Sequence, residues 1–146
     1  MKEIIINDDI SLIPYYENFD ETLLWYQDYV LCKQVDNIDY IYDKDMLVRM
    51  YKSLNEDGLC FYIKYKQNLV GDVTLKDNNE LCIVISKPYQ NMGIGKVTIK
   101  EIIKLAQKDN RKELRANIYD FNKQSRRMFE SVGFKYFKDE WYIYQI

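Results

Sequence analysis

The stretch "LCIVISKPYQNMGIGKVTIK" (residues 81–100) joins an apolar run to an amphipathic one through a loop that contains Gly93 and Gly95. Its first five residues are mostly β-branched, which is typical of a buried strand. Downstream, the apolar residues that follow the spacing of one helix face are Ile99, Ile102, Ile103 and Ala106. A glycine turn that leads into a helix presents free backbone N–H groups and the positive end of the helix dipole, so the stretch predicts a phosphate site.

Two common phosphate loops do not match this stretch. A P-loop requires a glycine where this chain has Gln90, and a serine or threonine where it has Val97. A Rossmann loop requires a third glycine at the position of Thr98, and it normally lies near the start of a βαβ unit. Here the loop lies past the middle of the chain, so we expect a different class of phosphate ligand.

The composition is typical of a globular protein, and we interpret residues 1–146 as one domain, with 47% hydrophobic and 30% charged residues. The net charge of −2 provides no basic field that would favour nucleic acid. No apolar run approaches the roughly 20 residues of a membrane helix, and the start "MKEIIINDD" does not resemble a signal peptide. We therefore expect a cytoplasmic protein that binds neither nucleic acid nor a membrane.

The cysteine and histidine content excludes several kinds of chemistry. Cys32, Cys60 and Cys82 are odd in number and widely spaced, which favours reduced thiols over a disulfide framework. The chain has no histidine, so it lacks the usual general base and the residue common to most catalytic triads and zinc sites. We expect chemistry that uses carboxylates, hydroxyls or backbone groups and no metal.

The hydrophobic pattern predicts one series of elements in the order ββααβββαβαββ, without an internal repeat. Two strands, "KEIIIN" and "ISLIPYY", precede helices at about residues 20–31 and 44–54. The segments "LCFYIKY" and "LVGDVTL" form a hairpin around "KQN", and another strand begins near Glu80. After the glycine helix come the strand "ELRANIY", a helix at residues 123–132, and the strands "FKYF" and "WYIYQI". We expect the last strand to be buried in the sheet or at a dimer contact.

Three anchors together resemble the acetyl-CoA signature of the GNAT superfamily of N-acetyltransferases. They are Gln90-x-x-Gly93-x-Gly95 after one strand, Asn122-x-x-Ser125 after the next, and "MFESVGF" from Met128. The resemblance covers about residues 80–134, and "LLWYQD" and "GDVTL" upstream are weaker matches. It implies an α+β (α/β) fold, with a central mixed sheet of about seven strands, about four flanking helices, and strands at residues 83–85 and 114–118 that splay apart.

The resemblance also implies which residues bind the coenzyme. The pyrophosphate of acetyl-CoA lies over the loop amides, and the pantetheine arm pairs with the first splayed strand like an added strand. The implied cofactor-binding residues are Ile83, Val84, Ile85, Gln90, Asn91, Met92, Gly93, Ile94, Gly95, Lys96, Asn122, Ser125 and Phe129.

Several of these residues also have a purely structural interpretation. Asn122 is a favoured helix N-cap, and Asn-x-x-Ser is an ordinary helix start. Gly133 is typical of the left-handed residue that ends a helix. Trp25 and Tyr26 either line an acceptor pocket or pack in the core.

The catalytic groups remain alternatives at this level. The resemblance implies Glu80 as the catalytic base that deprotonates the amine, with Asp72 or an ordered water as alternatives. Where many relatives have a tyrosine that protonates the departing thiolate, this chain has Phe129, which leaves Tyr119, Tyr136, Ser125 or water for that role. We expect direct acetyl transfer from acetyl-CoA to a primary amine of a small molecule or a protein N-terminus, by a monomer or homodimer. The alternative is a non-catalytic acyl-CoA sensor of the same fold.

Overall fold

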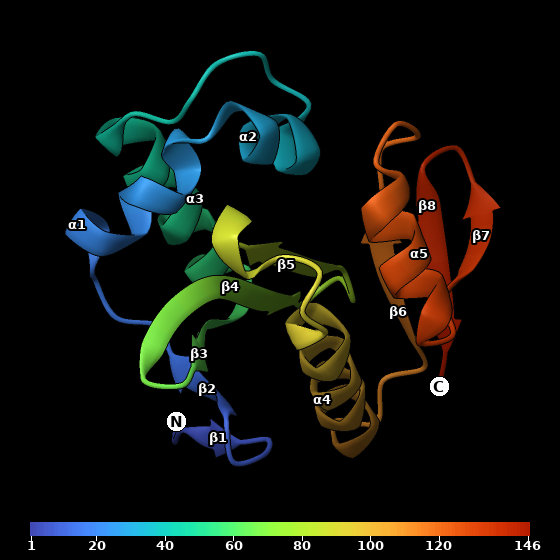
Figure 1. Cartoon of the computed structure of the whole chain (residues 1–146). Coiled ribbons are helices and arrows are strands. Elements are labelled where there is room, and N and C mark those ends of the chain that lie inside the picture. Colours follow the sequence, from blue (N-terminus) through green and yellow to red (C-terminus); the bar gives the residue numbers. More distant parts are fainter.

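The computed structural model describes all 146 residues (Figure 1). The N-terminal half contains β1 (Ile4–Ile5), β2 (Ile10–Pro14), α1 (Phe19–Thr22), the 3-10 helix η1 (Leu23–Gln27), α2 (Tyr29–Asp36), α3 (Lys44–Glu56), β3 (Gly58–Tyr65) and β4 (Asn68–Lys76). The C-terminal half contains β5 (Leu81–Ile85), the 3-10 helix η2 (Lys87–Tyr89), α4 (Ile94–Lys108), β6 (Glu113–Asn117), α5 (Lys123–Ser131), β7 (Lys135–Lys138) and β8 (Trp141–Gln145).

The eight strands form two sheets, and the α+β fold class predicted from the sequence is confirmed. One sheet has the order β1-β2-β3-β4-β5 and the other the order β6-β8-β7. All neighbouring strands are antiparallel, and a single parallel bridge between Glu80 and Arg115 links the two sheets. The predicted mixed sheet of about seven strands is thus two antiparallel sheets joined at one point.

The helix predicted at residues 20–31 is wrong, because this segment is three short helices. Asp28 is extended, with φ −107° and ψ 121°, and its side chain accepts the Leu31 N–H at 2.9 Å. Such an N-cap begins a new helix and leaves no continuous one through the position. The consequence is that α2 runs on to Asp36, five residues beyond the predicted end, and reaches the neighbourhood of the glycine loop.

The predicted hairpin of β3 and β4 is confirmed. Lys66 and Gln67 form its turn, both with positive φ, as a two-residue connection between twisted strands requires. Alternation along β3 then divides its side chains between two hydrophobic clusters: Phe61 and Ile63 belong to one, and Cys60 and Tyr62 to the other.

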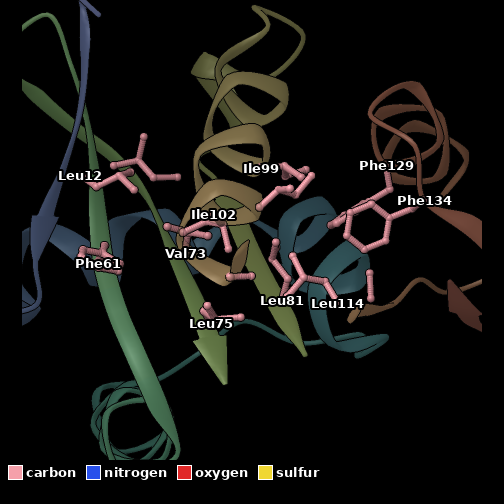
Figure 2. Close-up of a cluster of buried hydrophobic side chains, with 14 of the residues drawn as sticks. Leu12, Phe61, Val73, Leu75, Leu81, Ile99, Ile102, Leu114, Phe129 and Phe134 are labelled. Atoms are coloured by element: carbon pink, nitrogen blue, oxygen red, sulfur yellow. The ribbon is translucent and has the colours of Figure 1, made fainter. Parts of the chain in front are cut away.

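The larger cluster lies between the first sheet and α4 (Figure 2). The helix contributes the predicted apolar face, and Ile99, Ile102 and Ala106 are completely buried. Phe129 and Phe134 extend the same cluster to α5 and the second sheet, with their rings 5.0 Å apart. This packing fixes the position of α4, and therefore of its N-terminus, against β5.

The smaller cluster lies on the opposite face of the sheet, under α1 to α3 (Figure 1). It is unusually rich in tyrosine, and its buried tyrosines are Tyr26, Tyr42, Tyr51 and Tyr62. Each of these hydroxyls needs a partner away from water, and two of them find it in Asp72 of β4.

The remaining sequence expectations concern the C-terminus, the cysteines and membranes. The last strand, β8, lies between β6 and β7, where Tyr142 is buried. The three cysteines are free thiols. None of the helices combines the length and the apolar character that a membrane span requires.

Candidate active site

The open edge of β5 is the first element of the site. Backbone bonds to β4 are formed at Glu80 and at Ser86, so the even-numbered residues of β5 direct their N–H and C=O groups toward β4. Ile83 and Ile85 therefore direct theirs to the opposite side, where no strand pairs with them. The Ile85 carbonyl accepts the Gln90 side-chain N–H at 2.9 Å, and the other groups of this edge remain available.

A gap lies beside β5 because β6 is next to β5 at one point only. Glu80 and Arg115 form the parallel bridge, and the Arg115 N–H donates to the carbonyl of Asn79 at 2.9 Å. Beyond this bridge the strands diverge, and β6 pairs with β8 instead of β5. The predicted splay between residues 83–85 and 114–118 is present.

The glycine loop brings the N-terminus of α4 to the open end of this gap. Gly93 has φ 82° and directly precedes the helix, and Asn91 also has a positive φ. A Cβ atom on Gly93 would meet nothing within 4 Å, so the residue borders open space. The first-turn N–H groups of Ile94, Gly95 and Lys96 have no intrahelical acceptor, which makes this end of the helix suitable for an anion.

At Gly95 the absence of a side chain allows close packing between two helices. A Cβ atom there would lie 2.5 Å from the Met128 sulfur and 3.9 Å from Ile85. Met128 comes from α5, so Gly95 allows α5 and the start of α4 to approach each other across the gap. The close approach narrows the gap into a cavity.

The side chain of Gln90 ties three parts of the site together. Its amide N–H groups reach the Ile85 carbonyl and, at 3.3 Å, the Gln34 side chain of α2, while its oxygen accepts from Gln124 at 3.4 Å. Gln90 thus closes the loop by side-chain hydrogen bonds.

These elements enclose a cavity of about 410 Å³, here called the loop cavity. Most of the implied cofactor residues line it: Ile83, Val84, Ile85, Gln90, Asn91, Gly93, Ile94, Gly95, Lys96, Asn122 and Ser125. Met92 is exposed beside the loop and does not line the cavity. Phe129 is buried in the core and faces a second cavity. Arg127 adds a second positive charge, besides that of Lys96, to the lining.

The second cavity, here called the acidic cavity, has a volume of about 440 Å³ and lies on the α2 side of β5. Its carboxylates are Asp36, Asp72 and Glu80. Six residues line both cavities, namely Gln34, Val35, Ile83, Val84, Asn122 and Ser125. The two cavities therefore meet at the middle of β5, where a group held in one can reach a group held in the other.

Glu80 lies at the closed end of the splay. Its side chain is 19% exposed, and Oε1 lies 3.6 Å from Lys76 Nζ. Four residues separate Glu80 from Val84, so it is roughly 13 Å along the strand from the meeting point of the cavities. Contact with a group at that point therefore requires a water or a long substrate.

Asp72 lies closer to the meeting point, because it pairs with Val84 across the ladder. Its carboxylate is 2% exposed and accepts hydrogen bonds from Tyr26 at 2.6 Å and Tyr51 at 2.9 Å. Burial raises the pKa of Asp72 to about 6, although the two phenols oppose this rise. A carboxyl group with such a pKa can exchange a proton near neutral pH.

The candidates for proton donation to a leaving group are not all at the site. Tyr119 and Ser125 line the acidic cavity, whereas Tyr136 is 59% exposed on β7, away from both cavities. Tyr136 is therefore excluded as the proton donor to the leaving group. Phe129 packs edge-to-face on Phe134 and has no hydroxyl to offer.

Asn122 has the capping role predicted for it, and also a second one. Its Oδ1 accepts the Ser125 N–H at 3.2 Å, and its Nδ2 donates to the Gln34 carbonyl at 3.3 Å. The N-terminus of α5 is thereby held against α2 at the junction of the two cavities.

Sequence reasoning missed the contribution of α2. Gln34 and Val35 line both cavities, and Asp36 lines the acidic one. The available signals were Asp28, an N-cap that begins a new helix at Tyr29, and Asn37, a left-handed C-cap residue that ends this helix after Asp36.

Comparison with known families gives a clear match. The model of the acetyltransferase (GNAT) family matches residues 20–134. This range includes the loop, both splayed strands and all the residues that line the loop cavity.

Solved structures of the same fold cover almost the whole chain. A microcin C7 self-immunity acetyltransferase in complex with acetyl-CoA and AMP is 20% identical, with a TM-score of 0.79 over 99% of this chain and 97% of its own. A ribosomal L7/L12 α-N-protein acetyltransferase in complex with coenzyme A is 12% identical, with a TM-score of 0.80 and coverage of 99% and 98%. Spermidine N-acetyltransferase from Vibrio cholerae, in complex with CoA and spermine, is 16% identical, with a TM-score of 0.72 and coverage of 94% and 93%.

Proposed function

The chain belongs to the acetyltransferase (GNAT) family, and on this premise we propose that it transfers the acetyl group of acetyl-CoA directly to the nitrogen of a primary amine. The observation that carries the proposal is the loop cavity, which combines an unpaired strand edge with a helix N-terminus and opens into a second cavity. One cavity suits the coenzyme, and the other suits the acceptor.

The residues of the loop cavity fit coenzyme A. The first-turn amides behind Gly93 suit the pyrophosphate, because the space beside this glycine is open. The free N–H and C=O of Ile83 suit the amides of the pantetheine arm, which would add to β5 as a strand does. Lys96 and Arg127 supply positive charge for the phosphates. Bound there, the coenzyme would supply the activated acetyl group.

The acceptor nitrogen must lose a proton before it can attack. At pH 7, deprotonation of an alkyl ammonium with a pKa near 10.4 costs roughly 4 to 5 kcal/mol, and deprotonation of an α-amine with a pKa near 8 costs about 1 to 2 kcal/mol. We assign the role of base to Glu80 acting through water, as the family resemblance implies. Asp72 is the alternative, favoured by its position opposite Val84 and by its pKa of about 6.

Departure of the coenzyme A thiolate does not require a tyrosine hydroxyl at the position that Phe129 occupies. A thiol with a pKa of about 8.5 is a fair leaving group near neutral pH. Tyr119 and Ser125 both line the acidic cavity and carry hydroxyl groups, which makes them our candidates for the proton donor. Of the two, Ser125 is the nearer to the coenzyme, because it also lines the loop cavity.

The second candidate function is an acyl-CoA sensor without catalysis, and Phe129 at the tyrosine position is the observation that favours it. Release of coenzyme A, followed as free thiol with a panel of alkyl amines, aminoglycosides and peptides, separates the two functions. The proposal predicts amine-dependent release well above the rate without amine. A protein that binds acetyl-CoA but shows no such release with any amine of the panel would be a sensor.

A further inference from the structure

The charges that line the acidic cavity do not balance. Asp36, Asp72 and Glu80 supply three carboxylates, and Lys76 is the one cationic side chain of the lining. Lys76 lies 3.6 Å from Glu80 and pairs with it. Asp36 and Asp72 are left without a cationic partner, and for Asp72 this is costly because the residue is buried.

Asp72 forms the floor of this cavity and has a free oxygen. The hydroxyls of Tyr26 and Tyr51 both donate to Oδ2, and Oδ1 accepts no hydrogen bond from the protein. The residue lines the cavity although it is only 2% exposed. Because Asp72 lines the cavity, its Oδ1 is open to a hydrogen-bond donor held there, and a carboxylate oxygen in such a place usually has one.

The carboxylates act together on the neutral groups between them. Burial and the hydrogen bond to Asp36 raise the pKa of Tyr42, and the charge of Asp72 raises it further. Burial raises the pKa of Cys82 to about 12, and the charges of Glu80 and Asp72 raise it further, while Lys76 opposes them. The interior of the cavity is therefore at a negative potential, which favours a cation.

Asp36 adds negative charge at the mouth of the cavity. It is exposed, and it is the last residue of α2, where the helix dipole is negative. Tyr42 donates a hydrogen bond to Asp36, and its ring lies 4.8 Å from that of Tyr26, which donates to Asp72. A continuous wall of two tyrosines thus runs from the carboxylate at the mouth to the carboxylate on the floor.

The lining of the acidic cavity also suits a hydrocarbon chain. It includes aromatic rings from Tyr26, Tyr42, Tyr119, Phe129 and Trp141. Aromatic faces contact methylene groups and attract ammonium groups. The volume of about 440 Å³ is within the range of small-molecule sites.

We propose that the acceptor is a small aliphatic diamine, with one ammonium on Asp72 Oδ1 at the floor of the acidic cavity and the other at Asp36 at its mouth. This inference rests on the proposed function, because it names the substrate class of the same site. Asp72 and Asp36 are the specificity residues, and the methylene chain lies along the tyrosine wall.

The test is a calorimetric titration of the CoA-saturated protein, which requires no turnover. The probes are putrescine and the matched monoamine n-butylamine. The wild-type protein is expected to bind putrescine about two- to fivefold more tightly, the effect typical of one exposed ion pair. Asp72→Asn is expected to weaken both ligands about tenfold or more, since it removes a buried charge. Asp36→Asn is expected to weaken putrescine alone and abolish the preference.

The matched control is Asp39→Asn. Asp39 is 89% exposed, pairs with Lys33 at 3.4 Å, and lies outside the cavity, so neither affinity should change. Equal affinity of the wild-type protein for the two amines would overturn the proposal, as would a folded Asp72→Asn variant that binds both amines normally. Asp36→Asn, at an exposed position, keeps the test valid if the buried variant does not fold.

The binding test also separates this inference from the proposed function. A protein that binds putrescine as predicted but releases no coenzyme A from acetyl-CoA would refute the function and retain the diamine site. A protein that acetylates peptide N-termini but does not bind putrescine would retain the function and refute the diamine site.

Discussion

Replacement of Asp72 by asparagine should change how the stability of the protein depends on pH. Asparagine has nearly the same shape and can still accept the hydrogen bonds from Tyr26 and Tyr51, but it carries no charge. In the wild-type protein the carboxylate is buried, and burial raises its pKa from 3.8 to about 6. Between these two values the folded protein holds a proton that the unfolded chain has lost. Raising the pH through this window therefore lowers the stability of the wild-type fold.

The magnitude follows from the two pKa values. At about 1.4 kcal/mol for each pH unit, the difference between 3.8 and about 6 amounts to about 3 kcal/mol when the titration is complete. About 2 kcal/mol of this falls between about pH 4.5 and pH 8, where the unfolding can be measured. The Asp72→Asn variant lacks this contribution. As the pH is raised from about 4.5 to 8, its free energy of unfolding relative to that of the wild-type protein should therefore rise by about 2 kcal/mol.

Urea unfolding of both proteins, followed by circular dichroism across this pH range, measures the effect. The difference between the two unfolding free energies isolates Asp72, because all other groups titrate in both proteins. Asp39→Asn is the control, for which the difference should stay flat. A flat difference for Asp72→Asn as well would show that the carboxylate is not buried as described.

Three further predictions concern the loop, the proposed base and a helix cap. Gly93→Val should raise the acetyl-CoA dissociation constant about tenfold or more, because valine disfavours the φ of 82° and projects into the open space; unchanged affinity in a folded variant would contradict this. Glu80→Gln should lower kcat by about 10² at pH 7 for an alkyl amine and recover activity toward the amine pKa; a wild-type pH–rate profile would end its role as base. Asn122→Ala should cost about 1 kcal/mol of stability in thermal unfolding, because it removes the acceptor of the Ser125 N–H; Asn122→Asp should recover only part of this, because it keeps the cap but loses the bond from Nδ2 to the Gln34 carbonyl.

The part of the fold that could be predicted from the sequence is the part specified by local signals. A β-branched strand, two glycines and an apolar helix face follow one another within residues 81–106, and each signal concerns neighbours in the chain. Asn122 predicts the start of α5 for the same reason, because its side chain caps the helix through the nearby Ser125 N–H.

The acidic cavity could not be predicted, because its parts come together only in three dimensions. Asp72 and Tyr26 are 46 residues apart and meet through a hydrogen bond between η1 and the first sheet. The helix predicted at residues 20–31 ends before Asp36, because Asp28 lies in its interior, whereas in the structure the Asp28 side chain caps a new helix. Tyr42 lies in a segment without regular structure, and no periodicity indicates its burial.

The central claim is that an acetyl group passes from acetyl-CoA in the loop cavity directly to an amine in the acidic cavity. The most direct measurement uses acetyl-CoA with an isotopic label in the acetyl group, followed by mass spectrometry of the amine, the coenzyme and the protein. Direct transfer predicts the label on the amine nitrogen, free coenzyme A in equal amount, and an unlabelled protein. Label retained on the protein, or coenzyme bound without any labelled amine, would contradict it.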